Sequence, residues 1–254
     1  MRGSYEIYNE LDYSLPIKLS VGEFDYDLPR KVEFGIKSFL MKNDFSKNCL
    51  SYPSDHSDFS QKLVHQIKIL ISFIHQLKIL LTAGSTESLR IIFDTFLNES
   101  KSVFFPIPSY SNALNLIKTK TLEIRREVCL NYQDIKDYLL QDSYSLVYLS
   151  SPNNPLGYIL SDNQIRELSV SFPQTIFVID SCYLEYDESF SNFNLFDCEN
   201  VVIVRTFSKA FGLAGLRIGY MYSNFETIQK LKNFRDPHLP TELAKYSALL
   251  ALKI

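Results

Sequence analysis

The chain has 254 residues, a formal net charge of −3 at pH 7 and a hydrophobic content of 46%. This mild acidity gives no reason to expect nucleic acid or an anionic membrane surface as a partner, whereas the hydrophobic content is enough for a sizeable core. The four cysteines lack metal-ligand spacing and the polar N-terminus lacks the apolar run of a signal peptide, so we expect free thiols, no metal and a cytoplasmic location.

The first part of the chain combines an irregular arm with helical patterns. Residues 1–30 carry many tyrosines and aspartates with little periodicity, which predicts an extended arm. Residues 31–40 and 58–77 carry apolar residues at helical spacing, and each is expected to form a helix. Polar and charged residues interrupt the apolar stretch 67–81, so it is not expected to span a membrane.

Short apolar runs predict the strands of a sheet. They begin near residues 79, 103, 146, 176 and 201, and residues 122–128 alternate as an edge strand would. Helices are expected after Gly84 and at 131–141, 226–234 and 241–254. Strands that alternate with helices predict an α/β fold with a mainly parallel sheet.

A lysine and several anion-binding residues follow the strand that starts at Val201. Lys209 comes three residues after this strand, and Arg217 lies eight positions beyond the lysine. A lysine amine can bond covalently to an aldehyde, while Thr206, Ser208 and Arg217 offer donors to a phosphate. The spacing therefore suits a phosphorylated carbonyl compound, although an isolated Ser-Lys pair is more often a surface lysine before a loop.

Other strands end in polar residues as well. Gly84, Ser85 and Thr86 open a helix, and free backbone N–H groups at a helix N-terminus favour a phosphate, although simple helix capping would also explain them. Asp180 ends a buried strand, where a carboxylate needs a cation unless it only caps the next turn. Asn154 precedes a proline in a geometry that exposes its amide.

Together these segments resemble a known family. Residues 206–220, TFSKAFGLAGLRIGY, are similar to the lysine signature of fold-type I, pyridoxal-5'-phosphate-dependent aminotransferases, most closely the histidinol-phosphate aminotransferase branch. The resemblance runs from about Lys18 to the end of the chain, with four separated motifs in the family's order. It implies a mixed, mainly parallel sheet of the seven-stranded type flanked by helices, as in the large domain of these transferases.

The resemblance also implies the catalytic roles. Lys209 would hold pyridoxal 5'-phosphate and act as general acid and base. Asp180 would keep the ring nitrogen protonated, and Asn154 and Tyr183 would tune the phenolic oxygen. Two departures from the family pattern are Leu156 in place of a threonine and Ser181-Cys182 in place of Glu-Ala.

Further residues would bind the cofactor without taking part in proton transfer. Tyr110 would stack on the ring. Tyr52 would reach the cofactor of a neighbouring subunit, although a tyrosine before a turn proline explains it equally well. The phosphate would be held by Gly84, Ser85, Thr86, Thr206, Ser208 and Arg217.

The implied organisation is an arm (1–30), a cofactor-binding large domain (31–240) and the start of a truncated C-terminal small domain (241–254). In aminotransferases that domain carries the arginine that binds the substrate's α-carboxylate. No residue of this chain can be assigned that role. The expected activity is transamination between an amino acid or amino-alcohol phosphate and a 2-oxo acid, in a homodimeric enzyme of amino-acid biosynthesis. A decarboxylase of the threonine-phosphate type, or a truncated non-catalytic protein that binds the cofactor, are the alternatives.

Overall fold

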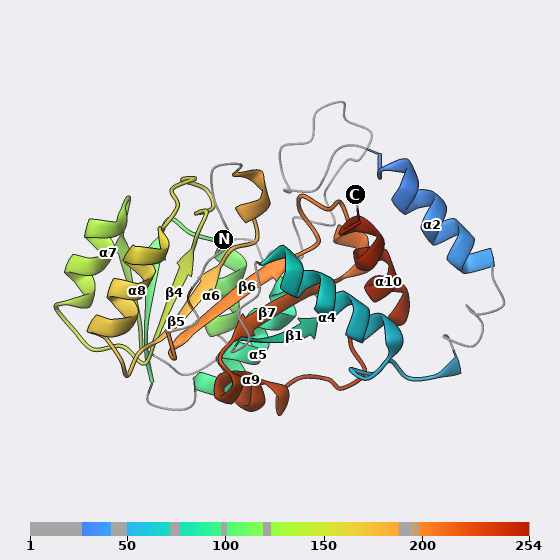
Figure 1. Cartoon of the computed structure of the whole chain (residues 1–254). Helices are drawn as coiled ribbons and strands as arrows, with labels where there is room; N and C mark the ends of the chain where they lie inside the picture. The colour runs from blue at the N-terminus through green and yellow to red at the C-terminus, as the bar shows by residue number, and fades with distance from the viewer. Residues whose placement is uncertain are drawn as a thin grey trace.

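Seven strands form one mixed sheet at the centre of the computed structural model (Figure 1). They are β1 (Lys78–Thr82), β2 (Ser102–Ile107), β3 (Glu123–Val128), β4 (Leu146–Ser150), β5 (Ile176–Asp180), β6 (Val201–Thr206) and β7 (Gly219–Ser223). Their order in the sheet is β1-β7-β6-β5-β4-β2-β3. Strands β3, β2, β4, β5 and β6 pair in parallel, whereas β7 runs antiparallel to both β6 and β1. The predicted fold class is therefore confirmed.

The structure describes residues 27–41, 50–71, 77–97, 101–118, 123–187, 195 and 198–253, so most of the predicted arm lies outside the described residues. The helices are α2 (Arg30–Met41), α4 (Asp58–Leu70), α5 (Ser85–Phe96), α6 (Ser111–Lys118), α7 (Tyr132–Leu139), α8 (Asp162–Ser171), α9 (Phe225–Lys232) and α10 (Glu242–Ala251). Two short 3-10 turns are η1 (Leu184–Tyr186) and η2 (Ala214–Leu216).

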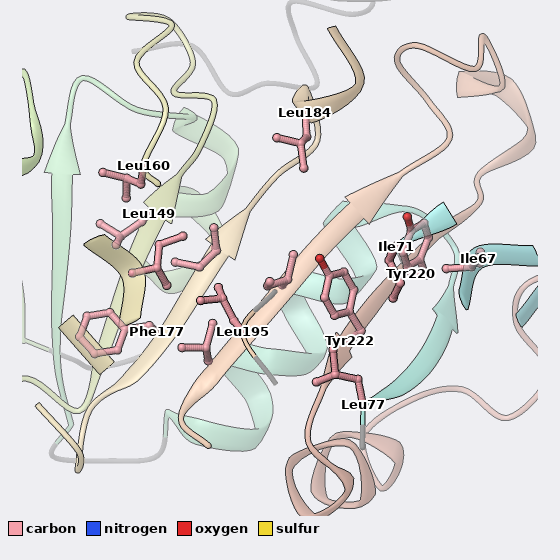
Figure 2. Close-up of a cluster of buried hydrophobic side chains, with 14 of the residues drawn as sticks. Ile67, Ile71, Leu77, Leu149, Leu160, Phe177, Leu184, Leu195, Tyr220 and Tyr222 are labelled. Atoms are coloured by element: carbon pink, nitrogen blue, oxygen red, sulfur yellow. The ribbon is translucent and has the colours of Figure 1, made fainter. Parts of the chain in front are cut away.

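Helices cover both faces of the sheet (Figure 1). On one face, α5, α6 and α9 pack against residues such as Val178 and Val204. On the other face, α4, α7 and α8 pack against residues such as Phe177 and Ile203, and Figure 2 shows part of this cluster. Helix α10 packs against α4 and α2 beside this second layer.

The position of each strand explains its sequence. The central strands β4, β5 and β6 are covered on both faces and read as nearly continuous apolar runs, as buried parallel strands do. Strand β3 lies at the edge of the sheet and carries charged residues that discourage pairing with another chain. The predicted edge strand at 122–128 is thus confirmed.

Some elements differ from the predictions. The helix expected over 58–77 ends at Leu70, with Ile71 as its C-cap, and residues 72–76 lie outside the described residues. Strand β7 is not among the predicted strands, because its sequence GYMYS begins with glycine, ends with serine and contains no aliphatic run. Helix α8 was also not located, although Ser161 and Gln164 form a capping box at its start.

A buried polar network fastens α10 to the loop before α4. Lys245 Nζ donates to Glu242 Oε1 at 2.8 Å and to the backbone oxygen of Ser54 at 3.0 Å. Ser57 Oγ donates to Glu242 Oε2 at 3.0 Å. The side chains of Lys245 and Glu242 are only 2% and 9% exposed, so each charge depends on the other for compensation.

Replacing Lys245 with methionine is expected to lower the free energy of unfolding by about 3 kcal/mol, because Glu242 keeps a buried charge without its cation. Urea denaturation measures this change. The double variant Lys245→Met/Glu242→Gln removes both charges and should recover most of the loss. A single variant as stable as the wild type would show that the ion pair does not hold α10 in place.

Candidate active site

The predicted site residues lie mainly at one edge of the sheet. Strands β4, β5 and β6 run parallel, so the loops that follow them emerge at the same edge, where open α/β sheets bind ligands. Asp180 is the last residue of β5, and Lys209 comes three residues after β6. Helix α5 begins directly after β1 and brings Ser85 to the same region.

Asp180 is a buried carboxylate with only half of its hydrogen bonding satisfied. Asp180 is 5% exposed, and its Oδ2 atom accepts a hydrogen bond from the hydroxyl of Tyr148 at 2.8 Å. Within the described ranges, Oδ1 makes no well-formed hydrogen bond, although the thiol and backbone N–H of Cys182 interact with the carboxyl. Burial raises the pKa of Asp180 above its ordinary value, and the polar groups of Cys182 and Tyr148 and the charge of Lys209 offset this only in part. Such a carboxylate would be stabilised by a cationic donor.

Tyr148 supports Asp180 and was not found by sequence reasoning. It lies on β4, and its ring stacks on Phe105 with the centroids 4.9 Å apart. Burial raises the pKa of Tyr148 well above its ordinary value, so the hydroxyl remains a neutral donor. The available signal was a tyrosine in an otherwise aliphatic central strand.

Lys209 lies against Tyr183 and close enough to Asp180 for its charge to act on that carboxyl. The Nζ atom of Lys209 lies over the ring of Tyr183, 5.2 Å from its centroid, and its charge lowers the pKa of Asp180. Tyr183 directly precedes η1 in the loop after β5. The structure therefore brings together the three residues that were predicted to be catalytic.

The residues predicted to bind a phosphate form a corner between β1 and β7. Gly84 has φ 92° and is the N-cap of α5, which has no side-chain cap, so the first N–H groups of the helix remain available. A Cβ atom at Gly84 would lie 2.8 Å from Nη2 of Arg217, so the guanidinium lies against this glycine. Arg217 Nη1 donates to Ser208 Oγ at 3.3 Å and to the Ala214 oxygen at 2.9 Å. Thr206 Oγ1 lies 3.0 Å from Ser208 Oγ.

Two close approaches of the backbone make this corner possible. Thr82 of β1 pairs with Gly219 of β7, and a Cβ atom at Gly219 would lie 3.0 Å from Gly84 Cα and 2.8 Å from the Arg205 oxygen. The turn is further held by Glu87, whose carboxylate accepts from the backbone N–H of Ala83. Glu87 was not predicted, although a glutamate in the third helical position is a signal for such a bond.

Cys182 connects the corner to the buried carboxylate. Its thiol interacts with both the Asp180 carboxyl and the Ser85 hydroxyl. Burial raises the pKa of Cys182 well above its ordinary value, so the thiol remains neutral. The two halves of the site are therefore neighbours, and one ligand can contact both.

The remaining predicted residues occupy different environments. Asn154 is half-buried, and its side-chain amide makes no hydrogen bond among the described residues. The neighbouring Asn153 is buried, and its Oδ1 atom accepts a hydrogen bond from the backbone N–H of Leu156 at 3.0 Å. Tyr110 is half-buried, and its hydroxyl accepts from Asn112 at 3.0 Å.

Two predicted residues are exposed. Thr86, in the first turn of α5, faces solvent. Tyr52 is 80% exposed, and its ring lies against His238 with the centroids 4.3 Å apart. The structure therefore does not bring Tyr52 together with the other site residues of its own chain.

The described residues offer neither a membrane-spanning helix nor a cluster of metal ligands. No described helix is both long enough and apolar enough to cross a membrane. Across the described ranges, no group of three or more His, Cys, Asp or Glu side chains is placed to hold a metal ion. Cys129, Cys182 and Cys198 are buried and form no disulfide with one another.

Comparisons with known proteins place the chain in a family. The family model for class I and II aminotransferases matches residues 15–253. A dihydroxyacetone phosphate transaminase of Campylobacter jejuni is 28% identical, over 86% of this chain and 59% of its own length. Histidinol-phosphate aminotransferase 2 of Pasteurella multocida is 32% identical, over 97% of this chain and 67% of its own length.

The fold is also found among solved structures. Histidinol-phosphate aminotransferase from Sinorhizobium meliloti, solved in complex with pyridoxal 5'-phosphate, superimposes with a TM-score of 0.79 at 20% identity. The match covers 91% of this chain and 63% of that one. The chain thus spans about three fifths to two thirds of the length of these relatives.

Proposed function

The chain belongs to the class I and II aminotransferases, and on that premise we propose that it binds pyridoxal 5'-phosphate and carries out transamination. The observation that carries the proposal is the buried carboxylate of Asp180, whose Oδ1 makes no well-formed hydrogen bond among the described residues and on which the charge of Lys209 acts. A buried anion in this state is suited to a protonated pyridine nitrogen.

The residues present fit the cofactor at both of its ends. The uncapped start of α5 adjoins the corner that holds Arg217 and would offer the backbone N–H groups of Gly84, Ser85 and Thr86, and Thr206 and Ser208 complete the donor set. These groups would hold the phosphate, because N–H dipoles and a guanidinium both favour an anion. Asp180 would hold the ring nitrogen, and Tyr110 would lie against the ring.

When bound, pyridoxal 5'-phosphate supplies an electron sink that acidifies the Cα–H bond of an amino substrate. Lys209 would hold the cofactor covalently at rest and, once displaced, its Nζ atom would take the proton from Cα as general base and return it as general acid. Asp180 would use its Oδ1 atom to keep the ring nitrogen protonated. Tyr183 and Asn154 would orient the phenolic oxygen through their hydroxyl and amide groups.

The proposed substrates are a phosphorylated amino compound and a 2-oxo acid. The support is that the names of the two curated relatives, a histidinol-phosphate aminotransferase and a dihydroxyacetone phosphate transaminase, both refer to phosphorylated small molecules. A decarboxylase would use the same lysine, aspartate and phosphate-binding groups. The products therefore distinguish the two reactions.

We further propose a homodimer, in which Tyr52 reaches the cofactor of the second subunit. Its outward position on the described surface supports this role, because the ring is free to contact another chain. A cytoplasmic location and a place in amino-acid biosynthesis fit the buried cysteines that form no disulfide with one another and the names of the relatives. We also retain the division into an arm, a large domain ending near residue 240 and the start of a small domain.

The purified chain, incubated with the cofactor, tests the function. We expect the near-visible absorbance of lysine-linked cofactor and transfer of nitrogen from phosphorylated amino compounds to a 2-oxo acid. Release of CO2 without nitrogen transfer would favour the decarboxylase. Cofactor absorbance without either product would favour a non-catalytic binding protein, and absence of the absorbance would overturn cofactor binding itself.

Replacing Gly84 with alanine should weaken cofactor binding by about tenfold or more. The side chain would be strained at φ 92° and its Cβ atom would lie 2.8 Å from Arg217 Nη2, and strain of this kind costs about 1–3 kcal/mol. Titration of the absorbance band with cofactor gives the Kd. The matched control is Gly215→Ala in η2, close to Arg217 in the sequence, where a Cβ atom meets nothing within 4 Å. Equal affinity in both variants would exclude the close packing of Arg217 on Gly84 as a determinant of binding.

A further inference from the structure

A buried ion pair links the two segments that carry Tyr183 and Lys209. Nη2 of Arg205 donates to Oε1 of Glu185 at 2.7 Å, and the two side chains are 2% and 13% exposed. Arg205 is on β6, four residues before Lys209. Glu185 is in η1, two residues after Tyr183. The pair therefore ties the turn behind Tyr183 to the strand that leads to Lys209.

Two tyrosines of β7 enclose the pair. Tyr220 is the cross-strand partner of Arg205, and Tyr222 lies on the same face of β7 (Figure 2). Burial raises the pKa of both hydroxyls, that of Tyr222 to about 12, so neither carries a charge that could replace Glu185. The other titratable groups that act on these two tyrosines are Cys182, which acts on Tyr220, and Asp162, which acts on Tyr222.

Stability alone does not account for a charged pair at this position. A buried ion pair gains little over apolar residues of similar volume, because desolvation of both charges offsets their attraction. Its attraction is nevertheless directional and strong at low dielectric, so it restricts the geometry of the groups that carry it. Here the two charges lie on η1 and β6. The pair therefore restricts how these elements lie relative to each other, and with them the 5.2 Å separation between the Tyr183 ring centroid and Lys209 Nζ.

We propose that Glu185 and Arg205 are positioning residues that act through Tyr183, holding its phenol against the Lys209 amine. This inference rests on the proposed function, because Tyr183 is assigned to the phenolic oxygen of the cofactor there. A phenol that donates to an anionic oxygen stabilises the anion, so its displacement should raise the pH at which lysine-linked cofactor loses its proton.

The test is a pH titration of the absorbance band in the cofactor-loaded protein. Glu185→Gln and Tyr183→Phe should each raise the midpoint, by about one pH unit. The double variant Glu185→Gln/Tyr183→Phe should shift it no further than Tyr183→Phe alone, because one residue acts through the other. Arg205→Lys keeps the charge and should give a smaller shift than Arg205→Met.

Two further variants separate positioning from folding. Glu185→Gln/Arg205→Met leaves neither partner charged, so it should unfold at a temperature near that of the wild type while the midpoint is still raised. Glu167→Gln removes an exposed ion pair with Lys136 and should leave the midpoint unchanged.

The possible outcomes distinguish the two proposals. A wild-type protein without the absorbance band would overturn the proposed function. If the midpoint of the band is the same in the wild type and in Glu185→Gln/Arg205→Met, the positioning role is wrong. It is also wrong if the shifts of Glu185→Gln and Tyr183→Phe add in their double variant.

Discussion

Replacing Lys209 with alanine is expected to remove the near-visible absorbance of the cofactor-loaded protein and to lower kcat/KM by about 10²–10⁴-fold. Its Nζ atom is the amine that lies over the Tyr183 ring and close enough to Asp180 to lower the pKa of that carboxyl. Loss of this amine removes both the covalent attachment and the proton carrier. Absorbance spectra and steady-state rates measure the two effects.

An exposed lysine provides the control for this experiment. Lys230→Ala on α9 removes an amine of the same kind from the surface, and it should keep both the absorbance band and the rate. Survival of the band in Lys209→Ala would mean that another amine holds the cofactor, and Lys209 would then have no place in the mechanism.

Replacing Asp180 with asparagine is expected to lower kcat by about 10²–10³-fold, because a neutral amide cannot stabilise a protonated ring nitrogen to the same degree. The same change should make the cofactor-free protein more stable at pH 7. Burial raises the pKa of Asp180, so at neutral pH the folded state carries a carboxylate that it disfavours. Rates and thermal unfolding of the cofactor-free protein measure the two effects.

The pH dependence of the stability gain follows from the same shift. A carboxyl whose pKa is higher in the folded state binds more protons there than in the unfolded state. Ionised Asp180 therefore lowers the free energy of unfolding. This loss is absent below the ordinary aspartate pKa, grows as the pH rises from that value through the raised pKa, and is complete above the raised pKa. The gain from Asp180→Asn should thus shrink as the pH falls from 7 toward 4.

An exposed aspartate provides the comparison. Asp137→Asn on α7 should alter neither kcat nor the pH dependence of stability, because this side chain faces solvent. If Asp180→Asn destabilises the cofactor-free protein at pH 7, the carboxylate is satisfied within the chain and is not held ready for a cation.

Much of the sheet, and the proximity of several candidate site residues, could be predicted because those residues follow strand ends. Apolar runs located β1, β2, β4, β5 and β6, and parallel strands deliver their C-terminal loops to one edge. Asp180, Lys209 and Gly84 follow such runs in the sequence. Their proximity therefore follows from the topology.

The supporting residues could not be predicted in the same way. A strand covered on both faces has no alternation, so nothing indicated that Tyr148 and Asp180 share a face. Glu185 and Arg205 are 20 residues apart, and they meet only because β5 and β6 are neighbours. Tyr52 is exposed and its ring lies against His238, and its role stays a prediction about a second subunit.

The antiparallel pairing of β1 with β7 gives the molecule a further property. Gly84 and Arg217 are far apart in the sequence, and the corner that they form exists only while Thr82 remains paired with Gly219. Any fluctuation that detaches β1 from its neighbour dismantles the anion corner before the rest of the fold is lost. A ligand that binds only the closed arrangement must oppose this fluctuation. Slower amide hydrogen exchange along β1 in the loaded protein would record this, so the edge of the sheet reports whether the cofactor is bound.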